Sequence, residues 1–212
     1  AGATSPNPTG WATLSGLSVF TLFHMGLLQT LFTLGLLLVG AAGVWRLAAV
    51  FPSTRARIAA LLVYSLIPIV SGAMSSGQLT VIVVYAATPW LLHLIRRAAG
   101  IETADPASAD LDTTDGIIEL APGERLRRIL AAALALALAV AFAPVMLPLT
   151  VALTVVFALG TVLARGALAT AGWSLVAGLG AVVGAAVLNL PWITSWTWEG
   201  VVGAPPIGEA GI

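Results

Sequence analysis

The residues best suited to chemistry lie near the end of the chain, where residues 189–200 read NLPWITSWTWEG. Glu199 directly follows Trp198, and Trp196 stands two positions before Trp198. An inverting glycosyl transfer needs a general base within hydrogen-bond reach of the acceptor hydroxyl, and a glutamate can act as that base. Indole faces can stack against the apolar C–H patches of sugar rings. Glu199 is therefore a candidate catalytic base, and Trp196 and Trp198 are candidate substrate-binding residues.

The same segment also has a purely structural interpretation. Trp192, Trp196 and Trp198 fit an interfacial belt, because amphipathic indole rings prefer the boundary between lipid and water. Glu199 would then be an ordinary exposed residue of a loop, like Glu209 further along. The sequence leaves both interpretations open.

A second polar stretch interrupts an apolar region, where residues 71–78 read SGAMSSGQ. We predict a tight turn between two helices, because Pro68 ends or kinks the first helix and the glycines allow a sharp reversal. The polar side chains would cap the exposed backbone groups or line a cavity, since irregular backbone at membrane depth is tolerated only inside protein or beside water. The candidate substrate-binding residues of this turn are Ser71, Ser75, Ser76 and Gln78.

Several other kinds of chemistry are not expected. The chain has no cysteine, so disulfides and thiolate metal sites are excluded. His24 and His93 lie in different segments and are interpreted as interfacial residues, so no metal site is predicted. The sequence has no basic stripe for nucleic acid and no motif for a phosphate-binding loop or a cofactor. No Asp or Glu lies within an apolar stretch, which argues against a proton-coupled pump.

The composition indicates the environment in which these residues act. The chain is 59% hydrophobic and 8% charged, with a mean hydropathy of +1.02. Soluble domains carry about 25% charged residues. A chain so poor in charge cannot cover a water-exposed surface, so we predict a membrane domain in contact with the lipid bilayer.

Helices of about 20 apolar residues match a hydrocarbon core of about 30 Å. The run AAALALALAV alternates like a strand, but backbone groups in lipid must be satisfied internally and a helix is the better interpretation. Gly180 and Gly184 form a small-residue face that should allow close helix packing. We predict an all-α polytopic bundle of about six membrane-spanning helices, over residues 26–47, 56–75, 78–97, 126–145, 148–166 and 170–192.

The region before the first predicted span is shorter and more polar. Residues 11–24 contain Trp11, Leu14 and Leu17 at a spacing of three, which favours a short interfacial or re-entrant helix. The alternative is one long tilted helix over residues 12–35. The chain begins at Ala1 without a charged leader region and ends in a loop, so we expect one transmembrane domain over 1–212 that is a piece of a larger protein.

The arginines provide a test of this topology. If the six helices alternate in direction, one face of the membrane receives every basic residue, at or beside the connections 48–55, 98–125 and 167–169. The positive-inside rule makes that face cytoplasmic and places residues 68–78 and 192–212 outside the cytoplasm. We predict the bacterial cytoplasmic membrane as the location. The basic residues are Arg46, Arg55, Arg57, Arg96, Arg97, Arg125, Arg127, Arg128 and Arg165.

The long connection over residues 98–125 is also rich in carboxylates. We expect a cytoplasmic acidic loop, because the segment ETADPASADLDTTDG offers almost nothing apolar to bury. A metal site is conceivable there, but a solvated linker is the preferred interpretation.

Residues 35–97 resemble the membrane part of large bacterial cell-envelope glycosyltransferases. The pattern is an aromatic-arginine helix end, then Arg…Ala-Ala…Tyr-Ser-Leu-x-Pro, a Gly/Ser-rich turn and a Pro-Trp-Leu helix. Two related groups share it, namely multipass proteins with a family 2 glycosyltransferase domain and arabinofuranosyltransferase-like members of the GT-C class. The matching residues are Trp45, Arg46, Arg57, Ala59, Ala60, Tyr64, Ser65, Leu66, Pro68, Gly72, Ser75, Ser76, Gly77, Pro89, Trp90 and Leu91.

The resemblance implies a polyprenyl-phosphate-linked sugar donor used at the extracytoplasmic face for envelope polysaccharide synthesis. GT-C enzymes are expected to carry catalytic carboxylates in their first outer loop, whereas this chain has no Asp or Glu before Glu102. No catalytic residue is carried over for that reason. The alternative hypothesis is a non-catalytic scaffold or lipid-carrier translocation module attached to a glycosyltransferase. The partners expected are the bilayer, such a lipid-linked sugar and the remainder of the parent chain.

Overall fold

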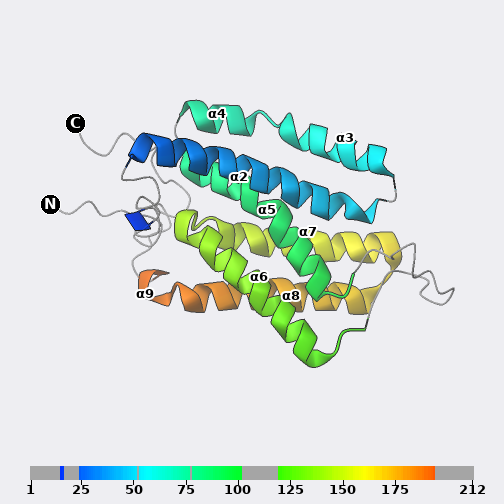
Figure 1. Cartoon of the computed structure of the whole chain (residues 1–212). Coiled ribbons are helices and arrows are strands. Elements are labelled where there is room, and N and C mark those ends of the chain that lie inside the picture. Colours follow the sequence, from blue (N-terminus) through cyan, green and yellow to red (C-terminus); the bar gives the residue numbers. More distant parts are fainter. Residues whose placement is uncertain (1–14, 17–23, 52, 77, 102–118, 194–212) are drawn as a thin grey trace.

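The computed structural model describes residues 15–16, 24–51, 53–76, 78–101 and 119–193. The fold is all-α, as predicted (Figure 1). The predicted acidic loop lies largely outside the described residues. The elements are α2 (Met25–Leu47), the short 3-10 helix η2 (Ala48–Val50), α3 (Thr54–Ser65), α4 (Ile69–Ser75), α5 (Leu79–Ala98), α6 (Pro122–Phe142), α7 (Met146–Arg165), α8 (Leu168–Leu188) and α9 (Leu190–Ile193).

In the described part of the chain, five segments are long and apolar enough to cross a membrane, namely α2 with η2, α3 with α4, α5, α7 and α8. The sixth predicted span corresponds to α6, which starts with a charged turn containing Glu124 and Arg128. Its apolar part from Ile129 to Phe142 is roughly 20 Å long at about 1.5 Å per residue, which is less than the hydrocarbon core. A multi-pass helical membrane architecture is confirmed, and the apolar part of α6 is shorter than each of the five segments that could cross the membrane.

The second span is broken where the sequence predicts a break. Helix α3 ends at Ser65 and α4 starts at Ile69, because Pro68 has no backbone N–H to continue the α3 hydrogen-bond ladder. The prediction of a turn over 71–78 was wrong in part, since α4 runs to Ser75 and keeps Ser71 in a helix. Small residues around Gly72 did not prevent helix formation once the proline had supplied the N-terminus.

The start of the first span bears on the alternative of one long tilted helix over residues 12–35. His24 has φ −78° and ψ 88°, outside the helical region, and α2 begins directly after it. A continuous helix over residues 12–35 is therefore not formed. The interfacial or re-entrant helix predicted for 11–24 lies almost entirely outside the described residues.

Helix α5 lies at the centre of the arrangement (Figure 1). It packs against α2 on one side and α6 on the other, and it also touches α4, α7 and α8. Helix α3 packs on α2 at the edge of the molecule, while α8 lies between α6 and α7. Successive long elements run in opposite directions, so the connections alternate between the two ends of the bundle.

The core is built largely from small residues. Helix α6 buries Ala133, Leu136 and Val140, which follow a helical spacing, whereas Leu134 and Leu138 on its other side are exposed. The alternating run AAALALALAV is thus helical, as predicted, with one leucine face turned toward lipid. Alanines at the contact allow the backbones to approach closely, which is how helices associate where lipid is as apolar as leucine.

The predicted small-residue face of α8 packs on α6. A Cβ atom at Gly184 would come within 2.7 Å of Ala133 Cβ, and one at Gly180 within 3.0 Å of an Ile129 methyl group. Gly178 is tighter still, because a Cβ there would overlap the side chain of Thr154 on α7. The prediction of close packing is confirmed.

Candidate functional site

The two ends of the bundle differ sharply in polarity. The end at the right of Figure 1 holds the C-termini of α2, α5 and α7 and the N-termini of α3 and α6. Every arginine of the chain lies in or next to these helix ends, and we call this the arginine end. The opposite end, which holds α4 and is called the serine end below, contains no charged residue among those described.

The predicted substrate-binding residues of the second span gather at the serine end. Ser71, Ser75 and Ser76 are exposed on or just after α4, and Gln78 is half-buried at the start of α5. Their placement on one short helix was not predicted, but their common location was. The other candidates, Trp196, Trp198 and Glu199, lie outside the described residues.

The three serine hydroxyls all donate hydrogen bonds to the backbone of their own helix. Ser71 Oγ donates to the Pro68 carbonyl at 2.8 Å, Ser75 Oγ to the Gly72 carbonyl at 2.9 Å, and Ser76 Oγ to the same Gly72 carbonyl at 2.7 Å. Such bonds occupy the hydroxyl proton and leave the oxygen lone pairs to accept. This surface is therefore suited to a ligand that donates hydrogen bonds, such as a polyol.

A second polar arrangement, inside the bundle, joins the interrupted span to α5. Tyr64 and Tyr85 stack with ring centroids 4.1 Å apart. Each hydroxyl donates to the backbone carbonyl of the other tyrosine, at 2.5 Å from Tyr64 and 3.0 Å from Tyr85. The pair is reciprocal in both its rings and its hydrogen bonds.

The prolines explain why these two carbonyls need a donor. Pro68 and Pro89 each stand four residues after a tyrosine, at the position whose N–H would bond the tyrosine carbonyl in a helix. A proline cannot make that bond, and an unsatisfied carbonyl in lipid costs on the order of several kcal/mol. The Tyr64 carbonyl also accepts the Ile67 N–H at 3.3 Å, so the Tyr85 hydroxyl is a second donor to it. The tyrosine hydroxyls supply donors to both carbonyls.

The sequence contains the pattern Tyr-x-x-x-Pro twice, as YSLIP and YAATP. The sequence analysis does not predict that the two tyrosines contact each other. The resemblance of residues 35–97 includes Tyr64, Pro68 and Pro89 but gives no reason for them. A repeat of Tyr-x-x-x-Pro in two neighbouring spans is enough to suggest mutual carbonyl capping. We call this pair the tyrosine–proline interlock.

Helix α2 contacts α5 closely beside this interlock. A Cβ at Gly40 would lie 2.9 Å from the Tyr64 hydroxyl, and one at Gly43 would lie 2.7 Å from the Trp90 ring. Trp90 Nε1 donates to the Val39 carbonyl at 2.7 Å across the same contact. The glycines thus give the aromatic side chains room between α2 and α5.

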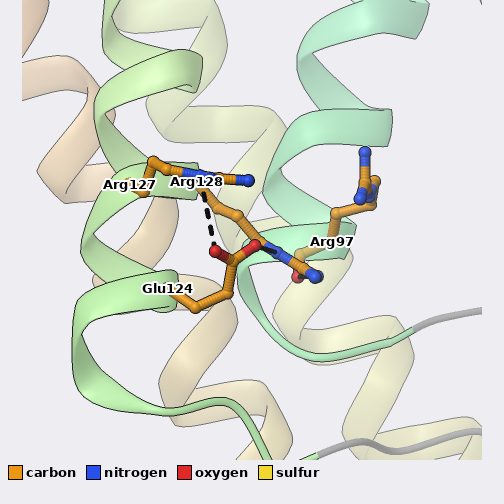
Figure 2. Close-up of polar contacts among 4 residues, drawn as sticks. All are labelled: Arg97, Glu124, Arg127 and Arg128. Carbon is orange, nitrogen blue, oxygen red and sulfur yellow. Dashed lines mark hydrogen bonds and ion pairs between the residues drawn. The ribbon is translucent and has the colours of Figure 1, made fainter.

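At the arginine end, the start of α6 forms a cluster of ion pairs that is hydrogen-bonded to α5 (Figure 2). Glu124 receives Arg128 Nε at 2.8 Å and lies 3.4 Å from Arg127 Nε. Arg128 also donates to the Arg97 carbonyl at 2.9 Å, which ties α6 to the last turn of α5. The hydrogen bond from Arg128 and the positive charges of Arg127 and Arg97 lower the pKa of Glu124 from its ordinary value of 4.5.

One further contact joins helices at the same end. The guanidinium of Arg125 lies 3.6 Å from the centre of the Trp173 ring, in a cation–π contact between α6 and α8. His93, which the sequence analysis interprets as an interfacial residue, is buried near the end of α5, as is Arg96. His93 packs edge-on to the Trp90 ring with centroids 6.2 Å apart.

Buried hydroxyls in α7 and α8 do not form a site. Thr150, Thr154 and Ser174 each donate to a carbonyl four residues earlier in the same helix. Asn189 donates to the Ala185 carbonyl at 2.9 Å and reaches the Ala137 carbonyl at 3.4 Å. These polar groups are satisfied locally and contribute to helix packing.

No cluster of three or more potential metal ligands occurs among the described residues. Comparison with protein-family models, curated proteins and solved structures finds no match for this chain. The function of the chain is therefore inferred from the polarity of its two ends and from the tyrosine–proline interlock.

Proposed function

We propose that this chain is the membrane-embedded part of a glycosyltransferase for cell-envelope polysaccharide, with a polyprenyl-phosphate-linked sugar bound at the serine end. The observation that carries the proposal is the group of exposed serines on α4, whose oxygens are available as acceptors. Sugar hydroxyls are donors that such oxygens can bind. The resemblance of residues 35–97 to envelope glycosyltransferases suggests the class of donor, a polyprenyl-phosphate-linked sugar.

The charge distribution supports the orientation that this function needs. All nine arginines lie at the end opposite the serines. By the positive-inside rule, the arginine end would face the cytoplasm and the serine end the outside of a bacterial cytoplasmic membrane. A lipid-linked donor can reach the serine end from the outer leaflet.

The experiment is a transfer assay with the full parent protein in membranes and a polyprenyl-phosphate-linked sugar donor. Replacing Ser71, Ser75 and Ser76 together by leucine should reduce transfer at least tenfold, because both acceptors and space are lost. Ser65→Leu is the matched control, since Ser65 is also an exposed serine of the same span but lies before the proline break. Unchanged transfer in the triple variant would contradict the proposal.

One observation favours a second function, a non-catalytic scaffold or carrier-translocation module. The described residues of the serine end include no carboxylate to act as a general base. Glu199→Gln distinguishes the two functions in the same assay. A large fall in the transfer rate constant supports a catalytic base at Glu199, and an unchanged rate supports the scaffold.

A further inference from the structure

We propose that the hairpin joining α2 to α3 binds the phosphate of an anionic lipid through Arg46, Arg55 and Arg57. The described residues of this hairpin are 45–51 and 53–57 at the arginine end, and we call them the arginine hairpin. The proposal is independent of the sugar-transfer function, which concerns the opposite end of the bundle.

The charge around the arginine hairpin has one sign. No Asp or Glu occurs anywhere before Glu102, so the hairpin and both of its helices are free of carboxylates. Arg127 and Arg128 of α6 differ, because Glu124 pairs with both of them. An anion at these two arginines would compete with Glu124, whereas no carboxylate of the hairpin or its two helices competes with an anion there.

The hairpin is also held in a defined shape. Arg57 Nε donates to the Phe51 carbonyl at 3.0 Å, and Arg57 Nη2 donates to the Ala49 carbonyl at 3.2 Å. Phe51 N–H in turn donates to the Ala48 carbonyl at 3.0 Å, and Ala48 is buried against the bundle. These bonds fix the turn while the guanidinium keeps further N–H groups that can donate to a phosphate oxygen.

Arg46 and Arg55 complete the positive surface. Arg46 is exposed in the last turn of α2, and Arg55 is exposed in the first turn of α3. Guanidinium groups bind phosphate oxygens through paired, charge-assisted hydrogen bonds. Three arginines in one hairpin give a positive surface that attracts the negative charge of a lipid phosphate.

Aromatic residues point to a lipid as the source of the phosphate. Trp45 is 40% exposed and Phe51 is 51% exposed, and both are part of the hairpin. Large aromatic side chains beside arginines are typical of the headgroup level of a bilayer. The helices on either side are membrane-spanning segments, so the hairpin meets the bilayer at the depth of lipid phosphates.

The test is native mass spectrometry of the full chain in detergent, titrated with phosphatidylglycerol and, separately, with zwitterionic phosphatidylcholine. Each arginine near an anionic surface contributes a factor of about five in affinity, so the variant Arg46→Gln/Arg55→Gln should bind phosphatidylglycerol about 25-fold more weakly. Arg127→Gln is the matched control, because its side chain is 81% exposed but already paired with Glu124. This control should change the affinity less than twofold.

Two further sets of variants are measured in the same lipid titration. The Arg46→Lys/Arg55→Lys variant should bind more tightly than the glutamine variant, since the charges remain, but more weakly than the unsubstituted chain, because an ammonium group cannot form the paired bonds of a guanidinium. Either single glutamine variant should lose about fivefold. Equal losses at Arg127 and at the hairpin, equal binding of phosphatidylcholine, or displacement of the lipid by millimolar inorganic phosphate would each overturn the proposal.

Discussion

At the scale of single residues, the tyrosine–proline interlock is a reciprocal pair of hydrogen bonds between two spans. Two prolines remove the donors for two carbonyls, and two tyrosine hydroxyls replace them across the contact between α3 and α5. Hydrogen bonds between membrane helices contribute about 0.6 kcal/mol on average and up to about 1.7 kcal/mol. We expect the bond from Tyr64 to the Tyr85 carbonyl to lie at the upper end of this range, because Pro89 removes the N–H that would bond this carbonyl in a helix. The Tyr64 carbonyl, in contrast, also accepts the Ile67 N–H.

This explanation predicts a coupling between Tyr64 and Pro89. Tyr64→Phe should destabilise the protein by about 1 kcal/mol, because the Tyr85 carbonyl loses its donor. In a Pro89→Ala background the same change should cost less than half as much, since the residue-89 N–H can then bond that carbonyl. Denaturant titration in detergent micelles measures both values. Equal costs in the two backgrounds would contradict the explanation.

At the scale of elements, the packing of α8 depends on where its glycines lie. Gly178→Ala should destabilise the bundle by about 1–3 kcal/mol, because the new methyl group meets the Thr154 side chain on α7. Gly172→Ala on the same helix is the control, because nothing lies within 4 Å of a Cβ there. This control should be neutral or stabilising by up to about 1 kcal/mol.

The same denaturation experiment compares these two variants directly. Equal destabilisation by Gly172→Ala and Gly178→Ala would show that backbone propensity, rather than the contact with α7, determines the effect. Both substitutions change one glycine of one helix to alanine, so differences in propensity largely cancel.

The sequence predicts the helices well, for physical reasons that can be traced to particular residues. Apolar length defines the spans, and Pro68 marks the break between α3 and α4 because its effect is local. The sequence predicts a turn from residue 71, whereas α4 continues to Ser75. The serines and Gly72 each favour a turn, which is why the helix was not predicted there. A helix N-terminus supplied by the proline overrides those local preferences.

The candidate sites were predicted less completely. The grouping of Ser71, Ser75 and Ser76 follows from their closeness in sequence, so it could be predicted. Contacts such as Tyr64 with Tyr85, or Arg125 with Trp173, join residues far apart in the chain. Helical periodicity says which face a residue occupies but not which residue of another helix it meets.

At the scale of the whole molecule, the two ends of the bundle differ in charge. The bundle is polarised, with every arginine at one end and the exposed serines of α4 at the other. The lipid-linked donor and the headgroup site are assigned to opposite ends for this reason. The orientation of the bundle in the membrane is therefore the property on which most of the account depends.

The most direct test is thiol labelling of intact cells from outside. The chain has no cysteine, and Ser53 and Ser75 are exposed serines at the two ends of the α3–α4 span. The account predicts that a membrane-impermeant maleimide labels the Ser75→Cys variant and leaves Ser53→Cys unlabelled until the cells are opened, provided the parent protein has no accessible cysteine. Labelling of Ser53→Cys alone would invert the topology and contradict the placement of the donor site at the serine end.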